Sequence, residues 1–179
     1  MASMALSVIG VTQLGPLPEK STLHCFTAQY YAYRAAEIRA WLPAVQSSVA
    51  ASVVTSLAFS SEWTFMDVAH SLPGIENTTN IVALSRSLVL RGYTVSLTQV
   101  EEMIEIAERS DSQNTHLCTR DCWINCFFVD TGESRAPIAV LDVSHGRRGW
   151  YARISKLDSE ESWEVENRFH IGNLNISKL

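Results

Sequence analysis

The spacing of apolar residues is helical through most of the first two thirds of the chain. Ser21 and Thr22 are good N-cap residues, and the run that follows them has no Gly or Pro before Pro43. This pattern predicts a long helix over 22–41. The apolar, Ser-rich segment 45–59 is long, and its length favours a helix over a strand.

Further helix signals follow between residues 62 and 109. The segment 62–72 has a helical pattern that ends at a Pro-Gly pair. The segment 79–91 follows two candidate N-caps, Asn77 and Thr78, and ends before Gly92. Ser96-Leu-Thr-Gln99 resembles a capping box and predicts a helix over 98–109, preceded by a short strand at 93–96.

The pattern changes near residue 112, where short β-rich runs begin to alternate with turn residues. These runs are 123–129, 138–143, 150–154 and 163–169. Helices followed by strands predict an α+β fold in which N-terminal helices pack on a C-terminal antiparallel β-meander. We expect 1–20, which is rich in proline, to be an extended arm, and 21–179 to form a single domain.

The large side chains of the β-rich half should fill the core, and the charged residues near the C-terminus should lie outside. The residues expected inside are Trp123, Phe127, Val140, Leu141 and Trp150, and those expected outside are Glu160, Glu161 and Lys178.

Composition narrows the protein class. A chain of 179 residues that is 46% hydrophobic and 18% charged is typical of a globular protein and excludes wholesale disorder. The net charge of −5 argues against a general nucleic-acid binder. We find no signal-peptide pattern and no apolar run of the roughly 18 residues that a bilayer span requires. We therefore expect a soluble protein in the cytoplasm, or one delivered into a host cytoplasm. Four cysteines, three of them bunched, favour a reducing compartment over a disulfide scaffold.

Cys25 is the candidate nucleophile. A cap at Ser21 or Thr22 places Cys25 in the first turn of the predicted helix, where the free backbone N–H groups and the helix dipole favour a thiolate. The structural alternative is that Cys25 is a small buried apolar residue, the usual role of a free cysteine.

Cys25 is followed by His145 at the mouth of a predicted strand, and then by Asp158 and Asn167. This order of residues, on helices followed by a sheet, is similar to that of papain-like cysteine peptidases. The resemblance covers roughly residues 21–169 and concerns layout, not a local motif. It implies that Cys25 is the nucleophile, that His145 is the base and acid, and that Asp158 or Asn167 orients the imidazole. The substrate would be a peptide or isopeptide bond.

The cluster of His116, Cys118, Cys122 and Cys126 contains residue types that bind zinc. It lacks the second pair of closely spaced ligands that structural zinc sites usually have, so a buried, cysteine-rich strand is favoured, and no metal or cofactor is expected. The remaining histidines, His24, His70 and His170, are interpreted as ordinary surface or capping residues.

A second function class stays open beside the hydrolase. Several basic residues gather in the β-rich half, which suggests a protein surface that binds an acidic patch or a phosphate-bearing ligand; they are Arg135, Arg147, Arg148, Arg153 and Lys156. The alternative to a hydrolase is thus a non-enzymatic interaction protein, such as an inhibitor, immunity protein or chaperone of bacterial or viral type, that uses an exposed sheet face. In both cases the partner is a protein or peptide, not a membrane or nucleic acid.

Overall fold

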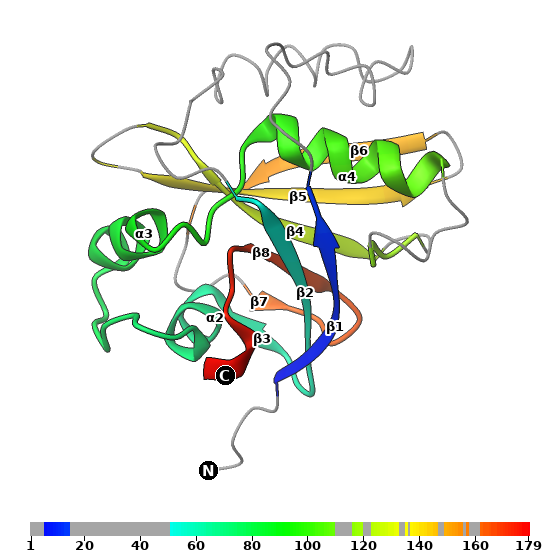
Figure 1. The fold of residues 1–179 in the computed structure, drawn as a ribbon. Coiled ribbons are helices and arrows are strands. Elements are labelled where there is room, and N and C mark those ends of the chain that lie inside the picture. The colour runs from blue at the N-terminus through cyan, green and yellow to red at the C-terminus, as the bar shows by residue number, and fades with distance from the viewer. Residues whose placement is uncertain are drawn as a thin grey trace.

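The computed structural model describes residues 6–14, 51–109, 116–119, 123–132, 135, 137–146, 149–155, 157 and 162–179. Within these ranges the protein has an α+β fold (Figure 1). The elements are β1 (Leu6–Gln13), β2 (Val53–Phe59), β3 (Trp63–Thr64), α2 (Phe65–Ser71), α3 (Ile81–Leu90), α4 (Leu97–Arg109), β4 (Ile124–Asp130), β5 (Ile138–Gly146), β6 (Gly149–Ser155), β7 (Ser162–Trp163), β8 (Arg168–Gly172) and the 3₁₀ turn η2 (Ile176–Lys178).

A six-stranded sheet forms the centre of the molecule, with the strand order β1-β2-β8-β4-β5-β6. Strands β4, β5 and β6 form the predicted antiparallel meander. The expectation of a purely C-terminal antiparallel sheet was wrong in two respects. Strands β1 and β2 come from the N-terminal half. Strand β8 lies between β2 and β4, antiparallel to β2 and parallel to β4. The predicted N-terminal arm contributes β1 to this sheet, and β3 and β7 form a separate two-stranded sheet.

The prediction of a helix over 45–59 was wrong for its described part, because Val53–Phe59 is strand β2. This strand is hydrogen-bonded on both sides, to β1 and β8, and most of its side chains are buried. A strand buried on both faces has a continuous apolar sequence and not an alternating one, so its periodicity does not distinguish it from a helix.

The predicted helices of the middle segment are confirmed as α2, α3 and α4, and their N-termini show why they begin where they do. Thr64 and Asp67 form a capping box at α2. The N-cap of α3 is Asn80, whose side-chain oxygen accepts a hydrogen bond from Ala83 N. The predicted caps, Asn77 and Thr78, do not have this role.

The predicted capping box of α4 is confirmed in both directions between Ser96 and Gln99. The strand expected at 93–96 reduces to a single bridge between Val95 and Val129.

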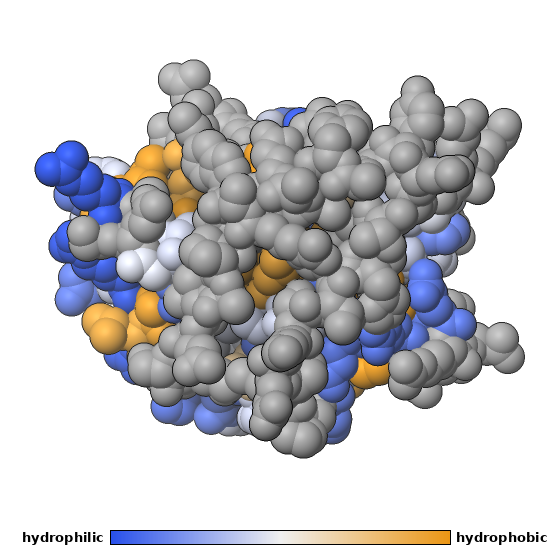
Figure 2. Space-filling view, turned by 90° about the horizontal axis from the view of Figure 1, so that it is seen from above, coloured by the Kyte–Doolittle hydropathy of each residue, from blue (hydrophilic) through white to orange (hydrophobic). Residues whose placement is uncertain are grey.

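The described helices lie on opposite sides of the six-stranded sheet (Figure 1). Helix α4 packs on one face through Val100, Met103 and Ile104, against a cluster that includes Phe127 and Leu141. Helices α2 and α3, with the small sheet, cover the other face, where the cluster includes Phe65, Leu84, Leu88, Phe128 and Phe169. On the side seen in Figure 2, both hydrophobic and hydrophilic residues of the described ranges are visible.

The expected core is largely confirmed. Phe127, Val140, Leu141 and Trp150 are buried, Trp123 is partly buried and Lys178 is exposed. Glu160, Glu161 and the predicted helix over 22–41 lie outside the described residues. None of the described helices combines the length and apolar character that a bilayer crossing requires.

Candidate functional site

Two of the four residues predicted to form a catalytic site, Cys25 and Asp158, lie outside the described residues. His145 lies near the end of β5, opposite Trp150 of β6, and is half-buried. Its ring meets the Trp150 indole edge to face, with 5.0 Å between ring centroids. The indole Nε1 of Trp150 is buried and has no hydrogen-bond partner among the described residues. His145 thus stands on the α4 side of the sheet, at the end of the β5–β6 hairpin.

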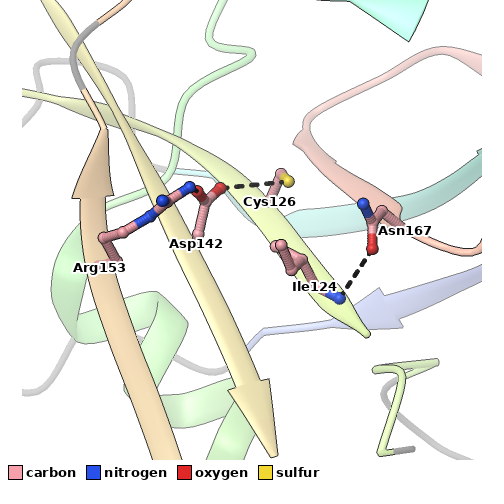
Figure 3. Close-up of polar contacts among 5 residues, drawn as sticks. All are labelled: Ile124, Cys126, Asp142, Arg153 and Asn167. Atoms are coloured by element: carbon pink, nitrogen blue, oxygen red, sulfur yellow. Dashed lines mark hydrogen bonds and ion pairs between the residues drawn. The ribbon is translucent and has the colours of Figure 1, made fainter. Parts of the chain in front are cut away.

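Asn167 is buried just before β8, and its side chain has a structural partner. Its Oδ1 accepts a hydrogen bond from the backbone N–H of Ile124 at 3.0 Å (Figure 3). Since Ile124 begins β4, this bond fixes the start of that strand beside β8. Strand β4 separates β8 from β5, which carries His145. The described contacts of Asn167 therefore support the sheet, and its predicted role of orienting His145 is not among them.

A row of hydrogen-bonded polar side chains crosses three neighbouring strands on the opposite face of the sheet. Cys126 on β4, Asp142 on β5 and Arg153 on β6 are in register. The Cys126 thiol donates to Asp142 Oδ1 at 3.3 Å, and the Arg153 guanidinium donates to Asp142 Oδ2 at 2.9 Å (Figure 3). The Asp142 side chain is only 4% exposed, whereas that of Arg153 is 61% exposed. A buried carboxylate therefore holds an exposed guanidinium in place.

Two more side chains belong to the same surface. Tyr151 lies two residues before Arg153 on β6, so both side chains project from the same face of the sheet. Ser144 lies opposite Tyr151 on β5. The Tyr151 ring lies over Gly146, where an added Cβ would come within 2.3 Å of a ring carbon. We call the surface formed by Ser144, Tyr151 and Arg153, with Asp142 beneath it, the β5–β6 polar face.

A second polar cluster is enclosed in the sheet around His170, which is 0% exposed. Its Nδ1 lies 2.8 Å from Ser56 Oγ, and its Nε2 lies 3.1 Å from Asn125 Oδ1. Phe127 stacks on the imidazole, with centroids 4.7 Å apart. Burial, together with the nearby charges of Arg168 and His116, lowers the pKa of His170 to about 3. His170 is consequently neutral near pH 7.

The amide of Asn125 determines which nitrogen of His170 carries the proton. Cys118 N–H donates to Asn125 Oδ1 at 2.7 Å, and Asn125 Nδ2 donates to the carbonyl of Cys118 at 2.9 Å. Because these bonds fix Oδ1 as the acceptor that faces His170, Nε2 must donate to it. Nδ1 then accepts the proton of the Ser56 hydroxyl.

The Ser56–His170 distance would suit a nucleophile and its base. However, both residues are 0% exposed, and the imidazole lies under Phe127. A substrate cannot reach them without opening the core, so this cluster satisfies buried polar groups and ties β2, β8 and β4 together. The interpretation of His170 as a surface or capping residue was wrong. The predicted strand stopped at residue 169, and no sequence signal marked His170 as part of the core.

The described part of the cysteine cluster shows no metal geometry. The thiols of Cys118 and Cys126 are buried, and no group of at least three His, Cys, Asp or Glu side chains in the described ranges is placed to hold a metal ion. Cys122 lies outside these ranges.

Comparisons of the chain with protein-family models, with curated proteins and with solved structures found no match. The resemblance to papain-like peptidases therefore stays a prediction based on the order of residues.

Proposed function

We propose that the protein is a non-enzymatic interaction protein that binds a protein partner through the β5–β6 polar face. The observation that carries this proposal is the Arg153–Asp142 pair, in which an exposed guanidinium is held by a buried carboxylate. Inhibitors, immunity proteins and chaperones are proteins of this kind.

The chemistry of the face supports a binding role. Arginine and tyrosine are over-represented among the residues that contribute most to protein–protein affinity. A long side chain normally loses rotamer freedom when it is bound, at a cost of roughly 0.5–1.5 kcal/mol. Because Asp142 already restrains Arg153 in the unbound protein, Arg153 loses less rotamer freedom when a partner binds.

The partner surface is expected to be acidic. The Arg153 side chain is 61% exposed, and a guanidinium is the side-chain group best suited to bind a carboxylate. Because the whole chain carries a net charge of −5, the attraction to an acidic patch comes from Arg153 itself and acts against the repulsion due to the net charge.

The described polar groups that resemble catalytic ones favour this function over an enzyme. The thiols of Cys118 and Cys126 are buried, and Asn167 binds the backbone of Ile124. His170 is neutral and enclosed in the core. Each of these side chains is buried, whereas Arg153 is largely exposed.

The test measures binding of Glu-rich peptides and of proteins from a cell extract. The wild type is compared with Arg153→Ala and Tyr151→Ala, and with Arg86→Ala as a control at an exposed arginine on α3. We expect anisotropy with a labelled acidic peptide to show at least about tenfold weaker binding for Arg153→Ala, equivalent to 1.4 kcal/mol, and little change for Arg86→Ala. Equal losses for both variants would indicate nonspecific charge attraction and would overturn the proposal.

The cysteine hydrolase with a papain-like layout is the second candidate. The observation in its favour is that His145, the predicted base, is half-buried at the end of β5 and not enclosed in the core. Its test is the rate of alkylation of each cysteine against pH, with hydrolysis of fluorogenic peptides measured in parallel. A thiolate at Cys25 well below the usual thiol pKa of about 8.5, together with hydrolysis that is lost in both Cys25→Ala and His145→Ala, would establish it. Slow, uniform alkylation with no hydrolysis would exclude it.

A further inference from the structure

Strand β1 is the outer strand of the six-stranded sheet, on the side away from the β5–β6 polar face (Figure 1). Its eight residues, LSVIGVTQ, contain no charge and no proline. Natural edge strands usually carry lysine, proline or a bulge that prevents pairing with another chain. Of these three features, β1 has only the bulge, which lies between Val8 and Gly10. The bulge leaves Gly10–Gln13 in regular register with β2.

The hydrogen bonds between β1 and β2 show which backbone groups face outward. Leu14 N–H donates to the carbonyl of Ser52 at 3.1 Å, just beyond the Gln13–Val53 pair. Directly opposed residues of an antiparallel pair alternate between hydrogen-bonded and non-hydrogen-bonded. Thr12 is therefore bonded to β2, whereas the backbone groups of Val11 and Gln13 point to the outer edge.

The neighbouring strand supports this assignment. The carbonyl of Val53, opposite Gln13, accepts from Asn173 N–H at 2.9 Å on the far side of β2. It is thus turned away from β1, as the non-hydrogen-bonded pair requires. In the described residues, no strand pairs with the outward groups of Val11 and Gln13.

We propose that this edge pairs with the same edge of a second copy of the chain, in an antiparallel, two-fold symmetric contact over Val11–Gln13. A two-fold axis at Thr12 places Val11 opposite Gln13 of the second copy, so that outward N–H groups meet outward carbonyls. Such an interface is self-complementary, as in most soluble homodimers. The absence of charge on β1 removes the repulsion that like charges on opposed strands would cause.

The same features set the strength of the contact. The bulge confines regular pairing to a short segment, so we expect a weak dimer that forms with increasing protein concentration. Each copy carries a charge of −5, and salt screens this repulsion over about 8 Å at physiological ionic strength. Added salt should therefore strengthen the dimer, whereas a contact based on ion pairs would weaken.

The test combines sedimentation with amide exchange, from micromolar to near-millimolar protein. We expect the average mass to approach that of a dimer. We also expect the amides of Val11 and Gln13 to become protected as concentration rises, while that of Thr12, bonded to β2, is protected throughout. A protein that stays monomeric, or a dimer in which Val11 and Gln13 still exchange freely, would overturn the proposal. If the amides of Val11 and Gln13 become protected only after a different protein is added, the edge binds a strand of that protein and the proposal of self-pairing is wrong.

Variants at Gln13 distinguish the contribution of the backbone N–H to dimerisation from that of the side chain. Gln13→Pro removes an outward N–H without removing a bond to β2, and Gln13→Ala keeps that N–H while removing the exposed side chain. We expect dimerisation at least about tenfold weaker for Gln13→Pro and nearly unchanged for Gln13→Ala. If circular dichroism shows that Gln13→Pro is unfolded, Gln13→Lys, which adds charge to the edge, takes its place. Undiminished dimerisation of the folded variant contradicts the inference.

Discussion

The hydroxyl oxygen of Ser56 lies 2.8 Å from Nδ1 of His170, and both residues are fully buried in the sheet. The bond joins β2, from the N-terminal half of the chain, to β8 near the C-terminus. Asn125 completes the network on the other side of the imidazole. A neutral histidine with both ring nitrogens satisfied can remain in an apolar interior, whereas a protonated one cannot do so without a large cost.

The lowered pKa of His170 predicts that the protein loses stability in acid. Its pKa is about 3 in the folded protein, against an ordinary value of 6.5. Between these values the unfolded chain binds more protons than the folded one, so stability falls as pH decreases. The contribution of His170 to this slope approaches about 1.4 kcal/mol per pH unit. Urea denaturation between about pH 7 and about pH 4, which covers most of that window, measures the slope.

The histidine variants separate this effect from the protonation of carboxylates. His170→Gln should show a shallower dependence of unfolding free energy on pH than the wild type. His70→Gln, at an exposed histidine of α2, should keep the wild-type slope. Identical slopes for wild type and His170→Gln would mean that His170 does not resist protonation.

Ser56→Ala should destabilise the protein by about 1–3 kcal/mol, because it leaves Nδ1 of His170 buried without a donor. The exposed Ser7→Ala on β1 is the matched control and should change stability by less than about 0.5 kcal/mol. Chemical denaturation at pH 7.5, roughly a unit above the ordinary pKa of histidine, gives both values. Equal stability of the two variants would show that the Ser56 hydroxyl is not needed.

A double-mutant cycle on Arg153 and Asp142 should give a coupling of about 1 kcal/mol. The value is modest because Arg153 is 61% exposed, although Asp142 is buried. The cycle compares Arg153→Ala, Asp142→Ala and the double variant by denaturation. Strict additivity would mean that Asp142 does not restrain Arg153, and the pre-organisation argument for the β5–β6 polar face would fail.

Trp150→Ala should cost about 3–5 kcal/mol, because this side chain is 3% exposed and packs in the cluster under α4. Leu90→Ala on α3 is the control, since Leu90 is 80% exposed and its truncation should have little effect. Thermal denaturation would show the difference as a large fall in melting temperature for Trp150→Ala alone. A small effect would mean that the cluster under α4 relaxes around the missing indole.

The sequence by itself determined the elements whose signals are local. The boxes formed by Thr64 with Asp67 and by Ser96 with Gln99 define the starts of α2 and α4 from residues three apart. The turn residues between 130 and 150 separate the strands of the β4–β5–β6 meander, and local patterning identified all three. Large apolar side chains such as Phe127 and Trp150 predicted the core, because their transfer from water is favourable wherever the chain places them.

Only the tertiary structure decided the features that depend on distant neighbours. Val53–Phe59 is a strand because β1 and β8 flank it, and its continuous apolar sequence is equally compatible with a helix. His170 is a core residue because Ser56 and Asn125, far away in the chain, satisfy its nitrogens. Arg153 is held in place because strand register puts Asp142 beside it. Burial and partners set the role of a polar side chain, and both arise only when the strands assemble.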